Sequence, residues 1–385
     1  MAGPLAIAQT VSDTRPEITP AQTHAGAWWP NRGSDPRDAY TGPEVCARCH
    51  ASIARTWSAT QMAHAIEPAA DSQYLRANPD MSFQRGKYTY RIARSGNQSI
   101  YSVTDGAQTL SVPLLWAYGV GVVGQAFIFR LNGTYYESEA AYYPVLHRLS
   151  VVAGLSGSPP PTLPAAFGLP LVPVAAQQCI SCHTTAAVTD NQLRVDEMIR
   201  GVTCEACHGP GARHVSLMEE RAKSASYRGR TVPAGAQAAN SLIFNPATLA
   251  PPAMENFCGA CHRTSALVIA EGLHGLDTVH YEPYRLEMSQ CWIMTRRITC
   301  VTCHDPHQPL QREAAYDSAC LSCHPATHRA AGAVRFGKAC PVATHNCATC
   351  HMPKCRLPRA PFVMSDHFIR IVAPADPCAA GRAAL

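Results

Sequence analysis

Charged residues are scarce in this chain of 385 residues: they account for 15% of it, and aromatic residues account for 7%. So few charges exclude an intrinsically disordered, solvated polymer. With 25 glycines and 31 prolines, the chain has too little of either residue for a low-complexity sequence. It also lacks a glycine-rich phosphate-binding loop and a Ser–His–Asp set that stands apart from its other histidines. We therefore expect a folded protein of about two or three domains without a nucleotide or hydrolase site of those types.

Uninterrupted hydrophobic stretches are missing as well. The segment Leu110–Phe129 is long enough to cross a membrane, but Pro113, Gly119, Gly121 and Gly124 interrupt it. The segment is rich in β-branched and aromatic residues, which favour strands. We expect buried strands here and no transmembrane span.

Cysteine is the residue that the chain has in excess, with 18 copies. Seven times the sequence reads Cys-x-x-Cys-His, and these motifs use fourteen of the cysteines. A random chain of this composition would contain about 0.04 copies of the motif. The cysteine pairs are Cys46 and Cys49, Cys179 and Cys182, Cys204 and Cys207, Cys258 and Cys261, Cys300 and Cys303, Cys320 and Cys323, and Cys347 and Cys350. The histidines that follow them are His50, His183, His208, His262, His304, His324 and His351.

This spacing is the attachment signature of haem c. Two cysteines three positions apart each add to one vinyl group of the same haem, and the histidine that follows binds the iron. Zinc sites built from Cys-x-x-Cys pairs do not require a histidine after every pair, and disulfides have no use for one. We therefore expect seven covalently attached c-type haems, with the motif histidines as proximal iron ligands.

Haem attachment also bears on location and charge. It takes place on the outer side of the energy-converting membrane, so we expect an exported protein, periplasmic or extracellular. No complete signal peptide is visible; Ala6-Ile7-Ala8 before Gln9 resembles the end of one, or an ordinary tail of small residues. The formal charge of +5 does not indicate a nucleic-acid partner. Each ferric haem with two neutral axial ligands adds about −1, so seven haems bring the charge to about −2.

The motifs divide the chain unevenly. We expect an extended N-terminal arm at residues 1–42, with Trp28-Trp29 as an anchor. Residues 43–178 hold the first motif, a β-hairpin insertion and a Pro-rich connection, and residues 179–372 hold the other six motifs. Residues 373–385 form a C-terminal tail. Roughly 29 residues per motif cannot bury both themselves and a haem, so the haems must supply much of the core.

This density predicts the fold class of a multihaem cytochrome c: mainly short α-helices and irregular chain wrapped around a closely packed haem array. A small antiparallel β element is expected near residues 85–140. Residues 87–94 and 99–104 alternate in the manner of strands. Asn132-Gly133, between two further strand-like runs, is a strong signal for a two-residue hairpin.

Ten histidines lie outside the motifs, and seven haems need seven distal ligands for full bis-histidine ligation. The seven candidates are His64, His214, His280, His307, His328, His345 and His367; His24, His147 and His274 are weaker. His307 follows the fifth motif by three residues, too close to reach comfortably over its own haem. We expect it to cap a neighbouring haem and so to couple two haems. Met62 competes with His64 as a distal ligand.

Four cysteines lie outside the motifs: Cys291, Cys340, Cys355 and Cys378. In an exported protein, an even remainder suggests two disulfides, although free buried thiols are the alternative. Four cysteines allow three pairings, of which we favour Cys291–Cys340 with Cys355–Cys378.

Several strings resemble those of multihaem cytochromes c of the cytochrome c-554-like, doubled-CxxCH group, in the same order and over roughly residues 40–372. They are PEVCARCH, TWSATQMA, CEACHGPGARH, IFNPATLAPPAMENFCGACH, YRLEMSQCW, ITCVTCHDPH, NCATCHMPK and SDHFIRI. The resemblance implies periplasmic or extracellular electron transfer, haem ligation by the matched histidines and a disulfide at Cys291. Such relatives often carry G-S-G-x-H before the hairpin, whereas this chain reads GVGVVGQ at 119–125. If that histidine is a ligand in relatives, one haem here needs another partner or has an open iron position.

Three functions compete. The first is electron transfer between a membrane oxidoreductase or other periplasmic donor and an external acceptor, with no catalytic residues beyond haem ligands. The second is a reductase or oxidase of a small nitrogen or sulfur compound at one open haem. The third is a subunit of a conducting extracellular filament or other homo-oligomer, in which His24 would cap a haem of the next subunit. We favour the electron carrier.

Overall fold

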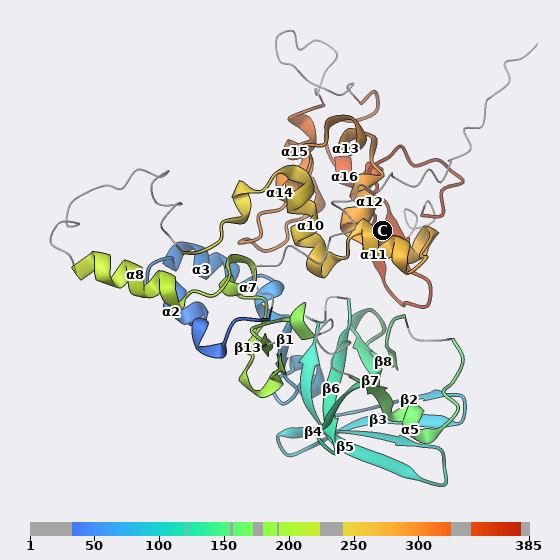
Figure 1. Ribbon diagram of the computed structural model, residues 1–385. Coiled ribbons are helices and arrows are strands. Elements are labelled where there is room, and N and C mark those ends of the chain that lie inside the picture. The colour runs from blue at the N-terminus through green and yellow to red at the C-terminus, as the bar shows by residue number, and fades with distance from the viewer. Residues whose placement is uncertain are drawn as a thin grey trace, which may run out of the picture.

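The computed structural model describes residues 33–119, 121, 123–154, 157–171, 180–190, 192–223, 242–324 and 340–378. Most of the N-terminal arm, with Trp28-Trp29 and His24, lies outside these ranges, as do Cys179 and His328. In the described part, a β-sheet occupies one half of the molecule and short helices occupy the other (Figure 1).

The sheet has nine strands, all paired in antiparallel fashion. Strands β2 to β8 lie side by side in sequence order, β1 is added to β5, and β9 is added to β7. The strands β2 and β8 approach each other, so that the sheet nearly closes on itself. The strands are β1 Ile66–Pro68, β2 Asp80–Arg85, β3 Tyr88–Ser95, β4 Gln98–Thr104, β5 Thr109–Tyr118, β6 Gln125–Leu131, β7 Thr134–Tyr143, β8 Arg148–Val151 and β9 Gly168–Pro170.

Ordinary side chains form the core of this sheet. In β3, for example, Tyr88, Tyr90 and Ile92 are buried while the residues between them are not, because successive side chains of a strand point to opposite faces. Helix α5 (Leu163–Phe167) covers the core, and its Phe167 ring stacks on Tyr101 at 5.3 Å between ring centres. This half of the molecule therefore has a hydrophobic core without any haem.

The expected fold class was wrong on this point. A sheet that runs from Ile66 to Pro170 replaces the small β element expected near residues 85–140 and the mainly helical, haem-filled fold. The added strands β1 and β9 are three residues long, too short to show an alternating pattern. They join the sheet because β5 and β7 offer unpaired backbone groups, which only the tertiary structure reveals.

Three local predictions are confirmed. Strands β3 and β4 coincide closely with the runs expected at 87–94 and 99–104. Asn132 and Gly133 connect β6 to β7 with φ angles of 49° and 83°, the left-handed pair of a two-residue hairpin. The segment Leu110–Phe129 contributes to β5 and β6. No helix in the described ranges is long and apolar enough to cross a membrane.

The other half consists of short helices and loops (Figure 1). The α-helices, including α4 beside the sheet, are α2 Pro43–Ala47, α3 Ala51–Trp57, α4 Gln73–Ala77, α7 Cys204–His208, α8 Ala212–Lys223, α10 Pro251–His262, α11 Ser265–Ala270, α12 Glu282–Glu287, α13 Gln290–Thr295, α14 Cys300–Cys303, α15 Asp317–Leu321 and α16 Cys347–His351. The 3-10 helices are η2 Arg37–Ala39, η3 Met62–His64, η4 Pro144–Leu146, η5 Val195–Glu197, η7 Pro246–Thr248, η8 Gly275–Thr278 and η9 Glu313–Tyr316. Two-residue ladders join β10 Thr184–Thr185 to β13 Ile199–Arg200 and β11 Val188–Thr189 to β12 Gln192–Leu193, and a three-residue ladder joins β14 Lys354–Arg356 to β15 Val363–Ser365.

The hairpin turn gives a stability prediction. Gly133→Ala should lower the free energy of unfolding by about 1 kcal/mol, because an L-residue is strained in the left-handed region. Gly157→Ala is the control, since both glycines have open space at the Cβ position but only Gly133 has a positive φ angle. Chemical denaturation of the two variants measures the difference. Equal stabilities would contradict the turn assignment.

Candidate haem sites

Each described motif sits on one turn of helix. A motif lies within or at the end of helices α7, α10, α14, α15 and α16, and the first motif begins within α2. In the first, fifth and sixth motifs, the backbone N–H of the histidine donates to the carbonyl of the first cysteine at 2.9 Å. Cysteines three positions apart on a helical turn share a face. This geometry presents two sulfurs and an imidazole to one ligand.

Four motif histidines have their Nδ1 atom within hydrogen-bonding distance of an oxygen. The partners are the Ala65 carbonyl for His183 at 3.3 Å, the Phe244 carbonyl for His208 at 2.8 Å, Glu282 Oε2 for His262 at 3.3 Å and the Arg370 carbonyl for His351 at 2.9 Å. These oxygens accept a hydrogen bond from the Nδ1–H group, which leaves Nε2 for a metal. The same arrangement orients metal-binding imidazoles in general.

Two motif histidines each lie close to a histidine from elsewhere in the chain. The ring centres of His208 and His307 are 6.1 Å apart, with an angle of 13° between the rings. The ring centres of His304 and His367 are 6.2 Å apart. An imidazole nitrogen binds a transition metal at about 2 Å and lies about 1.1 Å from its ring centre, so two imidazoles on opposite sides of one metal have centres roughly 6 Å apart.

The residues present fit haem c. The motifs whose residues are all described offer two cysteine sulfurs and one imidazole each, and the two histidine pairs have the ring-centre separation expected of two imidazoles on one iron. His304 contributes a buried Nδ1 atom that has no hydrogen-bond partner in the described residues. Burial lowers the pKa of His183, His304 and His367. These imidazoles are therefore neutral near pH 7, the form that binds metals.

Side chains of different motifs touch each other. The thiol of Cys46 interacts with that of Cys204, and Cys258 interacts with Cys300. Two further pairs do the same, namely Cys182 with Cys261 and Cys320 with Cys347. Motifs distant in sequence are therefore neighbours in space.

A buried carboxylate joins the first motif to the third. Glu205 lies inside the third motif and is 1% exposed. Its Oε1 accepts hydrogen bonds from the backbone N–H groups of Thr41 at 2.9 Å and Gly211 at 2.7 Å, and its Oε2 accepts one from Gly42 at 2.8 Å. Helix α2 begins directly after Gly42. One side chain thus fixes the start of the first motif's helix against the third motif.

A second carboxylate does the same for the sixth and seventh motifs. Asp317 is the first residue of α15, and its two oxygens accept from the backbone N–H groups of Asn346 at 2.6 Å and Cys347 at 2.7 Å. These donors begin α16, where the helix dipole also favours a negative charge. Neither carboxylate was singled out from the sequence, because the partners that join it to another motif lie 29 to 164 positions away.

The carboxylate of Glu282 makes the fourth motif different from the others. Its hydrogen bond to Nδ1 raises the pKa of His262. A carboxylate partner makes a metal-bound imidazole a stronger electron donor than a carbonyl partner does.

Of the candidate distal ligands, His307 stacks on a motif histidine and His367 lies tilted beside another. His64 instead has Nε2 at 2.8 Å from the Ser58 carbonyl, and the His280 ring lies 4.2 Å from Tyr281. His345 lies near Asp317, and His214 lies on α8. Of the weaker candidates, His147 follows η4 and His274 precedes η8.

The structure contains a disulfide between Cys355 and Cys378, one of the two favoured pairings. The other favoured pairing, Cys291–Cys340, is not formed, and both residues are free thiols. Cys291 lies on α13, within electrostatic range of Cys320 and Cys323, whereas Cys340 is exposed. A disulfide requires Cα atoms within about 7 Å, a condition that an even count of cysteines cannot guarantee.

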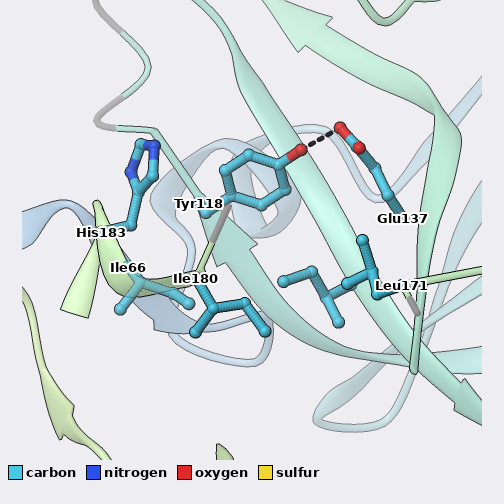
Figure 2. Close-up of a pocket in the computed structure, with 7 residues that line it drawn as sticks. Ile66, Tyr118, Glu137, Leu171, Ile180 and His183 are labelled. Atoms are coloured by element: carbon cyan, nitrogen blue, oxygen red, sulfur yellow. Dashed lines mark hydrogen bonds between the residues drawn. The ribbon is translucent and has the colours of Figure 1, made fainter. Parts of the chain in front are cut away.

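A small apolar cavity lies where the sheet meets the second motif (Figure 2). Ile66, Ile180 and His183 line it together with Tyr118, whose hydroxyl hydrogen-bonds to the half-buried carboxyl of Glu137. Burial raises the pKa of Glu137. The Tyr118 ring meets His183 edge-on, so the second motif packs against the end of β5, directly before the segment 119–125 that lacks a histidine.

Comparison with known proteins agrees with the motifs. Residues 171–209, which include the second and third motifs, match the family model described as cytochrome c554 and c-prime. Among solved structures, the outer cell wall cytochrome OcwA is similar with a TM-score of 0.40 and 15% identity, over 88% of this chain and 81% of that chain. No curated protein matches this sequence. The motifs and the family match together support a c-type cytochrome.

The Glu205 contacts predict a large effect on stability. Glu205→Ala should lower the free energy of unfolding by at least about 3 kcal/mol, because three N–H donors lose their acceptor in a buried place. Glu44→Ala, at an exposed position of α2, is the control and should change stability by less than about 0.5 kcal/mol. Chemical denaturation measures both. A small loss in Glu205→Ala would show that water replaces the carboxylate.

Proposed function

We propose that this protein is a multihaem c-type cytochrome that carries electrons through seven covalently bound haems. The observation that carries the proposal is the pairing of His208 with His307. His208 belongs to the third motif, and His307 follows the fifth. A haem between them would have its two axial ligands on peptides of two different motifs, which brings two irons close together.

The contacts between motifs support one continuous array. Cysteine contacts link the first motif to the third, the second to the fourth, and the fourth to the fifth. The His208–His307 pair links the third to the fifth. Cys303 of the fifth motif is within electrostatic range of Cys320 of the sixth, and the sixth contacts the seventh. The fifth motif would then be a junction where three branches meet.

Haem c supplies the reversible one-electron change at iron, and the protein sets how easily it occurs. The neutral imidazoles of His183, His304 and His367 would bind both the ferric and the ferrous ion. Carbonyl partners hold His183, His208 and His351 in one orientation, so little has to move when the charge changes. The carboxylate beside His262 would stabilise the ferric form of an iron bound there and would favour the lowest potential among these sites.

We propose further that the protein works outside the cytoplasm, in the periplasm or at the cell exterior, between a redox protein or membrane oxidoreductase and a terminal acceptor. The Cys355–Cys378 disulfide supports this, because disulfides persist in oxidising compartments. The family match supports a redox protein.

The first experiment is a haem count with a measurement of iron spin state. Intact mass and the pyridine haemochrome spectrum should give seven haems per chain. Electron paramagnetic resonance of the oxidised protein should show low-spin iron at sites with two histidine ligands. Fewer haems would contradict the proposed array.

The distal role of His307 is tested by substitution. His307→Ala should convert one low-spin haem to high-spin, because the third motif's iron loses its second imidazole. His274→Ala is the matched control, since His274 has no ring contact with a motif histidine in the described ranges, and its spectrum should equal that of the parent. A spectrum of His307→Ala that stays low-spin throughout would remove His307 as a ligand.

A further inference from the structure

The candidate ligand His367 sits in a segment with unusually strong anchoring. Its neighbour Asp366 is fully buried, and Arg285 of α12 binds both oxygens of that carboxylate, at 2.7 and 2.5 Å. Arg370 binds Asp366 Oδ2 at 2.7 Å. Bidentate arginine–carboxylate pairs fix direction as well as distance. The residue before the imidazole is therefore held from two sides.

The backbone on the other side of the imidazole is held as well. The hydroxyl of Ser289 donates to the carbonyl of His367 at 3.3 Å and accepts from the N–H of Ile369 at 2.8 Å. Both guanidinium groups, of Arg285 and Arg370, lie near the Phe368 ring, at 5.4 and 4.7 Å from its centre. Little freedom is left to the backbone that carries His367.

A covalent bond closes the same unit. Arg370 also binds both oxygens of Asp376, at 2.7 and 2.9 Å, and Asp376 Oδ1 accepts from the N–H of Cys378. Cys378 is bonded to Cys355, whose sulfur lies 3.8 Å from Asp366 Oδ2. The disulfide therefore encloses residues 355–378 in a loop that contains His367.

We propose that the Arg285–Asp366 ion pair, secured by the Cys355–Cys378 disulfide, positions His367 so that the iron of the fifth motif stays closed to outside ligands. This inference rests on the proposed function. Arg285 and Asp366 are positioning residues, since they act through His367 and do not touch the iron. Loosening them would let His367 move away from that site and would leave room for a small neutral donor such as imidazole.

The same segment serves a second motif. The carbonyl of Arg370 accepts a hydrogen bond from Nδ1 of His351, and the N–H of Arg370 donates to the His351 carbonyl at 3.1 Å. Residues 366–370 thus approach His304 of the fifth motif and the Nδ1 atom of His351 in the seventh. Loss of the ion pair should disturb the fifth site most, because only there does the segment provide the ligand.

The test uses the full-length protein loaded with haem. Arg285→Lys keeps the positive charge but loses the bidentate contact with Asp366. The double variant Cys355→Ala/Cys378→Ala removes the disulfide. His367→Ala sets the scale for complete loss of the ligand. We expect a high-spin ferric signal in each variant, up to one haem per chain in His367→Ala. Imidazole should bind at least about tenfold more tightly to each than to the parent and should restore the low-spin spectrum.

Arg91→Lys is the matched control, because Arg91 makes an equally two-pronged but exposed contact with Asp80 in the sheet. It should behave as the parent does. The proposal is overturned if Arg285→Lys and the double cysteine variant keep fully low-spin iron and the parent's imidazole affinity, or if His367→Ala itself shows no high-spin iron. A parent protein without haem on Cys300 and Cys303 would instead overturn the proposed function.

Discussion

A helix of four or five residues is not stable by itself, and this constraint governs the helical half of the molecule. Helices α2, α7, α14, α15 and α16 are all that short. Each must be held by contacts outside itself. Glu205 and Asp317 provide such contacts. Each of these buried or partly buried carboxylates accepts hydrogen bonds from backbone N–H groups at the start of another motif's helix. Stability and the placement of the motifs therefore have the same source.

The two halves of the molecule differ in how they form a hydrophobic core. The sheet buries its own tyrosine, phenylalanine and aliphatic side chains. In the helical half, the described apolar clusters are small, such as the one around Val279, Leu357 and the disulfide. Seven haems would add the apolar surface that this half lacks. A protein without haem should retain the sheet more readily than the helical half, because only the sheet has a complete core.

The chemistry was easier to predict from the sequence than the fold. The repeated motif indicates haem directly, since cysteine spacing and the adjacent histidine are local features. The hairpin at Asn132-Gly133 is equally local, and it was predicted correctly. The full extent of the sheet was not predicted, because strands β1 and β9 are too short to show an alternating hydrophobic pattern. The roles of Glu205 and Asp366 depend on partners far away in the sequence. The absent Cys291–Cys340 bond was missed because pairing depends on distance, which counting cannot give.

The cavity beside His183 has a consequence for how the sheet relates to the rest of the chain. Ile66 stands where the chain enters the sheet and Leu171 where it leaves, and both line that one cavity. The roughly one hundred residues between them therefore form a detour of the chain that starts and ends at this cavity. The loops of the detour that lie away from this cavity could be lengthened or shortened without changing the distance that separates the first motif from the second. Its surface can thus vary while the spacing of the two motifs stays as it is.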